Sequence, residues 1–143
     1  MIKEEFSQQI NAPVEKVFAY VTDFRKYPEW QDGVQESTQT PDGSTQLGTK
    51  FKTTRTFLGQ RLEASGEVTE FVANRKFAVK STSGPIQFSL MQTFEPVAGG
   101  TKVSILVEME AGGFFKLAEG ALAGNMKKEF QAQADKLKAI LEA

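Results

Sequence analysis

Regular alternation of apolar and polar residues through the middle of the chain is the feature that most limits its fold. Between residues 34 and 109, segments with an apolar residue at every second position are separated by turn signals, as in residues 61–68 and 103–109. Successive side chains of a strand point to opposite faces, so such segments form strands with one buried face. Short turns, such as Gly59-Gln60 and Gly99-Gly100, join antiparallel neighbours. The pattern therefore predicts a meandering antiparallel sheet.

Apolar residues at helical spacing lie on both sides of this region of predicted strands. A first strand, with Ile2, Phe6 and Ile10 on one face, precedes a helical insert within residues 12–30. At the other end, a stripe of apolar residues at helical spacing extends over residues 115–141, which predicts a long helix. A sheet that is apolar on one face must be covered, and this helix is the long element available to cover it.

These elements predict a single α+β domain over residues 1–143. Its curved antiparallel sheet of about seven strands wraps around the long C-terminal helix, with a short helical insert after the first strand. A curved sheet and a straight helix do not fit flush along their whole lengths. The space between them is therefore either filled by large side chains or left as an apolar cavity. The sequence leaves both possibilities open.

Two residue types are absent, and their absence limits the possible chemistry. The 143 residues contain no cysteine and no histidine, which excludes disulfides, cysteine-based zinc sites and histidine-dependent hydrolase triads. The 17 Lys and Arg residues and 18 Asp and Glu residues give a formal net charge of −1. A balanced charge does not favour nucleic acid as a partner. We expect no metal, no cofactor and no nucleic acid, and either a monomer or a homodimer.

The sequence also predicts where in the cell the protein is found. The polar N-terminal segment lacks the apolar run of a secretory signal, and no window approaches the roughly 18 consecutive apolar residues of a membrane span. We therefore expect a cytoplasmic protein without integral membrane association.

The candidate ligand-binding residues are those that strand alternation and helical spacing predict to face the space between sheet and helix. Most are aromatic or aliphatic, and the flexible methionine would adapt to varied ligands. The candidates are Trp30, Phe51, Arg55, Phe57, Leu62, Phe88, Leu90, Phe115, Leu122 and Met126.

Two of these candidates have alternative roles. Trp30, the sole tryptophan, could form a wall of an apolar pocket or anchor the helical insert on the sheet. Arg55 shares a face with Phe51 and would then need a partner inside, either Glu4 or Glu70 or an anionic group of a ligand. Alternatively, the opposite face of that strand is buried, or Arg55 reaches solvent at the strand end.

Other residues are candidates for acid–base chemistry or for helix packing. Glu4, Glu70 and Tyr20 are the plausible proton donors, but their spacing fixes no common geometry, and all three could equally be ordinary surface or ion-paired groups. Gly120 and Gly124, one turn apart, could allow close approach of a strand or let the helix flex. We therefore assign no catalytic residue.

Three stretches of the chain, together with the order of elements, resemble the START/Bet v 1-like superfamily, also called SRPBCC or helix-grip proteins. The likeness is greatest to its polyketide cyclase/dehydrase-like branch. The opening resembles that family in residues 10–18, Asp23 and Pro28-Glu29-Trp30. The central strands resemble it in Gly59 and residues 67–71. The later hairpins and the closing helix resemble it in residues 81–85, 94–97, 99–101 and 112–119.

The resemblance implies a helix-grip fold and a cavity for a hydrophobic ligand. The leading hypothesis is binding or transport of a lipid, a polyketide-like aromatic molecule or an isoprenoid. One alternative is a polyketide cyclase/dehydratase-like enzyme that uses the same cavity. A second alternative is a protein-binding module, whose signal would be an exposed apolar patch around Met91 or Leu106.

Overall fold

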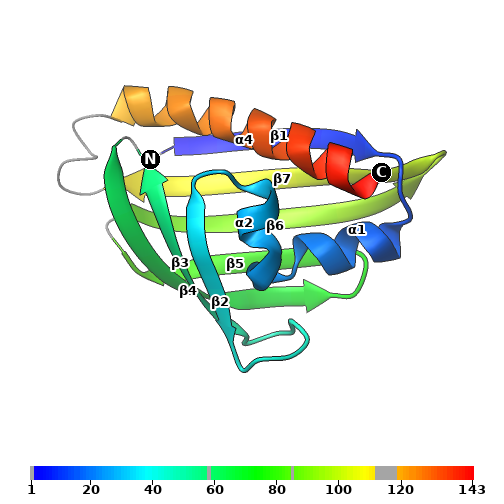
Figure 1. Ribbon diagram of the computed structural model, residues 1–143, viewed down its shortest axis with the longest axis horizontal. Coiled ribbons are helices and arrows are strands. Elements are labelled where there is room, and N and C mark those ends of the chain that lie inside the picture. Colours follow the sequence, from blue (N-terminus) through cyan, green and yellow to red (C-terminus); the bar gives the residue numbers. More distant parts are fainter. Residues whose placement is uncertain (1, 58, 85, 112–118) are drawn as a thin grey trace.

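The structure is a computed structural model that describes residues 2–57, 59–84, 86–111 and 119–143 (Figure 1). Its elements are β1 (Ile2–Ile10), α1 (Val14–Val21), η1 (Phe24–Lys26), α2 (Tyr27–Trp30), β2 (Val34–Thr40), β3 (Lys50–Phe57), β4 (Gln60–Val72), β5 (Lys76–Ser83), β6 (Ile86–Val97), β7 (Gly100–Ala111) and α4 (Glu119–Leu141). The predicted α+β fold, with an insert of short helices after the first strand and a long C-terminal helix, is confirmed.

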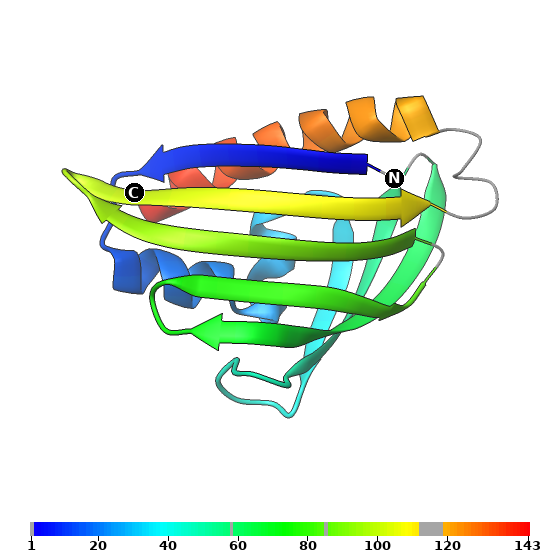
Figure 2. The ribbon, with the colours of Figure 1, turned by 180° about the vertical axis from the view of Figure 1, so that it is seen from behind.

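The strands form one seven-stranded sheet in the order β1-β7-β6-β5-β4-β3-β2. Strands β2 to β7 follow one another as antiparallel neighbours, as the short turns predict. The first strand, β1, pairs with the last, β7, from Ile2 opposite Met109 to Ile10 opposite Thr101. The helices lie on one face of the sheet, which curves around α4 (Figures 1 and 2). The meander therefore presents one concave face to the helix.

The end of the molecule around α1 is solidly packed. Val17, Phe18 and Val21 of α1 are buried against the sheet, as their helical spacing predicts. The Phe18 ring packs edge-on against Phe94 of β6, with ring centroids 4.9 Å apart. Pro13 occupies the N-cap position of this helix. Side chains of α1 and of the sheet therefore form a packed core at this end of the molecule.

Hydrogen bonds from the start of the chain hold the C-terminal end of α4. The backbone N–H of Asn11 donates to Glu142 Oε2 at 2.9 Å. Lys138 Nζ donates to the backbone oxygen of Gln9 at 3.2 Å and pairs with Glu142 at 2.9 Å. The helix is thus fixed to the junction between β1 and α1.

The two glycines of α4 do not mediate close packing. Apart from the adjacent residues and the backbone of α4 itself, no atom of the described residues lies within 4 Å of where a Cβ would stand at Gly120 or Gly124. Both glycines are exposed. The prediction that they let a strand approach closely is therefore wrong.

The outer face of the sheet carries few apolar side chains. Met91 and Leu106 are cross-strand partners there and are half-buried. The exposed large apolar residues among those described are Leu47, in the loop between β2 and β3, and Val72, at the end of β4. Among the described residues, no helix combines the length and apolar character needed to span a membrane.

Candidate ligand-binding cavity

A cavity of about 140 Å³ lies between the concave face of the sheet and the helices α2 and α4. Its walls are mainly apolar, formed by side chains such as Ile105, Val107 and Phe130. Most candidate residues predicted from the sequence line it, namely Trp30, Phe51, Arg55, Leu62, Phe88, Leu90 and Met126. The side chains of Phe57 and Leu122, and all of Phe115, lie outside the part of the chain that the structure describes. The space beneath α4 is therefore partly hollow.

A second cavity, of about 170 Å³, adjoins the first toward α1. Ile10, Val103 and Leu137 form its far wall. The side chains that border both cavities are Trp30, Gln92, Ile105, Phe130 and Gln133. Small-molecule sites usually have about 300–1,000 Å³, so the two cavities together reach the lower end of that range.

Trp30 fulfils both of the roles that the sequence left open. Its side chain is buried and borders both cavities. It also belongs to the buried core cluster that includes Phe51 and Val79 of the sheet, and so anchors α2 on the sheet. The residue that anchors the helical insert is therefore also part of the cavity wall.

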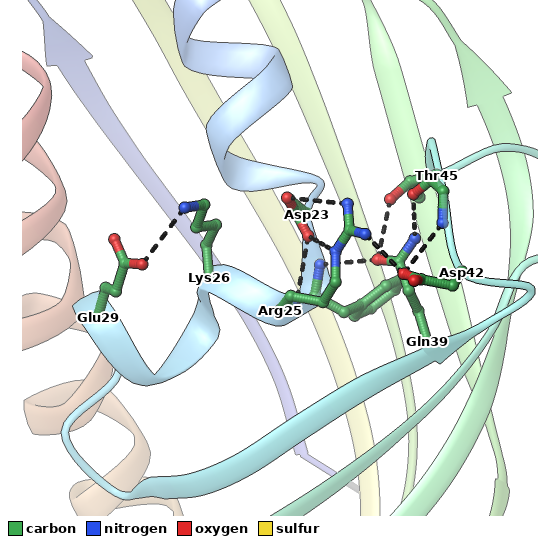
Figure 3. Close-up of polar contacts among 9 residues, drawn as sticks. Asp23, Arg25, Lys26, Glu29, Gln39, Asp42 and Thr45 are labelled. Atoms are coloured by element: carbon green, nitrogen blue, oxygen red, sulfur yellow. Dashed lines mark hydrogen bonds and ion pairs between the residues drawn. The ribbon is translucent and has the colours of Figure 1, made fainter.

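Polar contacts around η1 position another wall residue, Phe24. Its backbone N–H donates to Oε1 of the buried Gln39 of β2, at 3.3 Å. Arg25 pairs with Asp23 at 2.9 Å and with Asp42 at 2.7 Å, and so links η1 to the loop after β2 (Figure 3). These ion pairs are exposed and stabilise the fold only a little. They hold η1 beside the loop after β2, and Phe24 of η1 is part of the cavity wall.

The Arg55 side chain points into the cavity, as its shared face with Phe51 indicates. Its Nη2 donates to Gln31 Oε1 at 3.3 Å. Among the described residues, no carboxylate lies within 4.0 Å of its guanidinium group. Burial lowers the pKa of Arg55, and the negative charge of Glu129 on α4 opposes this shift.

The two protein carboxylates predicted as partners for Arg55, Glu4 and Glu70, are wrong. Glu4 pairs instead with Lys127 at 3.6 Å, and Glu70 pairs with Lys76 at 2.7 Å. Both pairs lie outside the lining of the two cavities. The opposite charge near Arg55 is that of Glu129. Glu129 lies on α4, so the alternation of side chains along the strands could not predict it.

The carboxyl group of Glu129 is the acidic group in the described lining of the first cavity. Burial raises its pKa, and this effect exceeds the opposing effects of Arg55 and of a hydrogen bond with Asn125. The folded protein therefore binds a proton at Glu129 more tightly than the unfolded chain does.

This shift predicts a pH-dependent effect of Glu129→Gln. A carboxyl group with a raised pKa in the folded state makes the free energy of unfolding fall as pH rises from its unfolded pKa, about 4.3, through its folded pKa. Urea unfolding at several pH values should therefore show that the variant gains stability relative to the unmodified protein toward pH 7 and loses that gain below about pH 4. Parallel stability profiles would contradict the assignment.

The residues predicted as proton donors do not meet at the cavity. Tyr20 donates its hydroxyl hydrogen to Glu29 at 2.8 Å outside the cavity lining. Burial, and then this hydrogen bond, raises the pKa of Tyr20 to about 12. Glu4 and Glu70 lie in the lysine pairs described above. Among the described residues, no cluster of three acidic side chains could hold a metal ion.

Gln92 and Glu129 are two of the polar lining residues that are not among the candidates predicted from the sequence. Gln92 shares the inward face of β6 with Leu90 and Phe94, so strand alternation could have placed it. Glu129 lies three positions after Met126 on α4, so helical spacing could have placed it too. A search for apolar residues at these spacings passes over both, because their side chains are polar.

Comparisons with known proteins cover nearly the whole chain. A family model described as polyketide cyclase / dehydrase and lipid transport matches residues 1–142. None of the curated proteins compared with the chain matches it in sequence.

Solved structures share the fold at low sequence identity. A conserved protein from Geobacillus kaustophilus superposes with a TM-score of 0.79 at 17% identity, over 98% of this chain and 95% of its own. A START superfamily protein from Mycobacterium smegmatis gives 0.77 at 16%, over 98% and 97%. Ara h 8.0201 gives 0.74 at 15%, over 98% and 97%. The predicted resemblance to START and Bet v 1-like proteins is confirmed for the fold.

Proposed function

The chain belongs to the polyketide cyclase/dehydrase and lipid transport family, and from this premise we propose that it binds a small hydrophobic molecule between the sheet and α4. The observation that carries the proposal is the pair of adjoining cavities with largely apolar walls. Packed protein interiors leave few voids larger than a water molecule. Apolar cavities of about 150 Å³ stay dry and bind molecules such as benzene. A hollow of this kind favours an apolar occupant.

The size and lining of the hollow support a compact ligand, such as a polyketide-like aromatic molecule, an isoprenoid or part of a lipid. Phe51, Phe88 and Leu90 would contact it from the sheet, and Met126 from α4. Aromatic side chains offer flat apolar surface for such a contact. Met126, 2% exposed, offers a flexible side chain that adjusts to the ligand's shape.

Binding is better supported than catalysis. A cyclase or dehydratase reaction would need an acid or base at the ligand, and the described lining of the first cavity offers Glu129 for that task in place of the predicted donors. Glu129 stands beside Arg55, at the polar side of a cavity whose remaining walls are largely apolar. The lining of the cavity therefore favours a protein that binds a molecule over one that converts it.

Isothermal titration with 2-methylnaphthalene tests the proposal. We expect saturable binding with one site per chain. Ala64→Phe adds a ring to the cavity wall and should weaken this binding by at least about tenfold, because the added ring takes the space of the ligand. Identification of compounds extracted with organic solvent from the purified protein would identify the natural ligand.

A matched variant controls for the added ring. Ala121 is exposed on α4 and lies outside the cavity lining. Ala121→Phe should therefore keep the affinity of the unmodified protein. Absence of binding to the unmodified protein, or equal affinity of the two phenylalanine variants, would contradict the proposal.

A further inference from the structure

Two buried polar atoms of the cavity wall have no hydrogen-bond partner among the described residues. These are Nε1 of Trp30 and Oε1 of Gln92. Each of the two residues is 5% exposed. Buried polar groups in native proteins are nearly always hydrogen-bonded, because leaving one unpaired costs free energy. An unpaired donor and an unpaired acceptor in one cavity wall therefore call for an explanation.

The position of these atoms suggests what satisfies them. Trp30 and Gln92 each border both cavities, so they stand where the two hollows adjoin. Apolar side chains surround this place, with Ile105 on the sheet and Phe130 on α4 also bordering both cavities. A molecule that extended through both hollows would carry its middle part past these two side chains.

The chemistry of the atoms restricts the group that could pair with them. An indole N–H only donates a hydrogen bond, and an amide oxygen only accepts one. A hydroxyl group does both at once, whereas a carboxylate or a carbonyl group only accepts. The charged side chain of Arg55 faces Glu129 and so already has an opposite charge nearby.

We propose that the ligand is an apolar molecule with a hydroxyl group that accepts a hydrogen bond from Trp30 Nε1 and donates one to Gln92 Oε1 where the two cavities adjoin. This inference rests on the proposed function and specifies its ligand class. The apolar parts of the molecule on either side of the hydroxyl occupy the two hollows. The two polar side chains then select hydroxylated molecules over hydrocarbons of the same shape.

Three probes of similar size test this selection by isothermal titration. They are 2-methylnaphthalene, 2-naphthol, in which a hydroxyl replaces the methyl group, and 2-naphthoate, which is an anion. The unmodified protein should bind 2-naphthol about tenfold more tightly than 2-methylnaphthalene, the gain of one to two buried hydrogen bonds. It should bind 2-naphthoate more weakly than 2-naphthol.

Variants assign the preference to the two side chains. Trp30→Phe removes the N–H and keeps an aromatic ring, and Gln92→Met removes the amide and keeps the length of the side chain. Each should reduce the preference for 2-naphthol to about threefold or less while 2-methylnaphthalene still binds. Gln87→Met, at an exposed position on the opposite face of β6, is the matched control and should keep the full preference. Circular dichroism confirms that each variant is folded.

The outcomes separate this inference from the proposed function. If 2-methylnaphthalene and 2-naphthol bind the unmodified protein equally, or if both variants keep the preference, the hydroxyl assignment is overturned and the apolar site stands. Tighter binding of 2-naphthoate that is lost in Arg55→Met would replace the hydroxyl by an anion. If the unmodified protein binds neither neutral probe, the proposed function itself fails.

Discussion

Phe24→Ala is expected to lower the free energy of unfolding by about 3–5 kcal/mol, the usual cost of deleting a large buried aromatic side chain. The Phe24 ring is 0% exposed and stacks on Phe51, with ring centroids 4.4 Å apart. It also contacts Phe77, at 5.8 Å between centroids. The loss is near the upper end of this range if the surrounding side chains do not move into the vacated space. Thermal unfolding followed by circular dichroism should show a Tm lower by about 10–15 °C.

The same substitution should also change the site, because Phe24 lines the first cavity. Removal of its ring would join a new void to that cavity and admit a larger apolar molecule than 2-methylnaphthalene. Phe88→Ala is the matched comparison, since Phe88 lines the same cavity but is only half-buried. It should lose less stability. Equal losses for both variants would contradict the view that Phe24 belongs to the packed core.

Gly66→Ala should be destabilising by about 1–3 kcal/mol, although it adds a single methyl group. A Cβ at Gly66 would stand 2.5 Å from the Phe51 ring and 2.5 Å from the backbone oxygen of Lys80. The ring could move, but the oxygen belongs to the neighbouring strand β5 and cannot move without disturbing the sheet. Because Phe51 lines the cavity, its displacement should also weaken the binding of 2-methylnaphthalene. Urea unfolding and isothermal titration measure the two effects.

The same substitution on α4 provides the control. Gly124 is exposed within the helix, and no described atom beyond the adjacent residues and the backbone of α4 lies within 4 Å of the place that an alanine methyl group would take. Gly124→Ala should therefore raise the free energy of unfolding by about 1 kcal/mol, because alanine favours a helix over glycine by that amount. If Gly66→Ala raises the free energy of unfolding as Gly124→Ala is expected to do, the account of Gly66 as a place of forced close approach is wrong.

The inward face of the sheet could be predicted because strand periodicity is strictly two. Once Phe51 is assigned to the core, Arg55 follows it to the same side, and the structure places both at the cavity. The same reasoning applied to Leu90 also reaches Gln92, which is buried. A prediction that counts only apolar residues on that strand misses Gln92. Periodicity indicates where a side chain points, whatever its polarity.

Contacts between distant elements could not be predicted in this way. Glu4 and Glu70 are plausible partners for Arg55 from the sequence, but each pairs with a lysine, and the charge near Arg55 is on α4. How a helix is rotated and placed over a sheet depends on the packing of the whole core, which one-dimensional spacing does not encode.

Trp30 gives this protein an optical property that follows from its place in the fold. It is the sole tryptophan of the chain, and its indole borders both hollows. Fluorescence excited at the red edge of protein absorption therefore arises from one site and reports on its occupancy without any label. An aromatic guest would quench or shift that emission, so that filling of the hollow could be followed in real time at nanomolar protein concentrations.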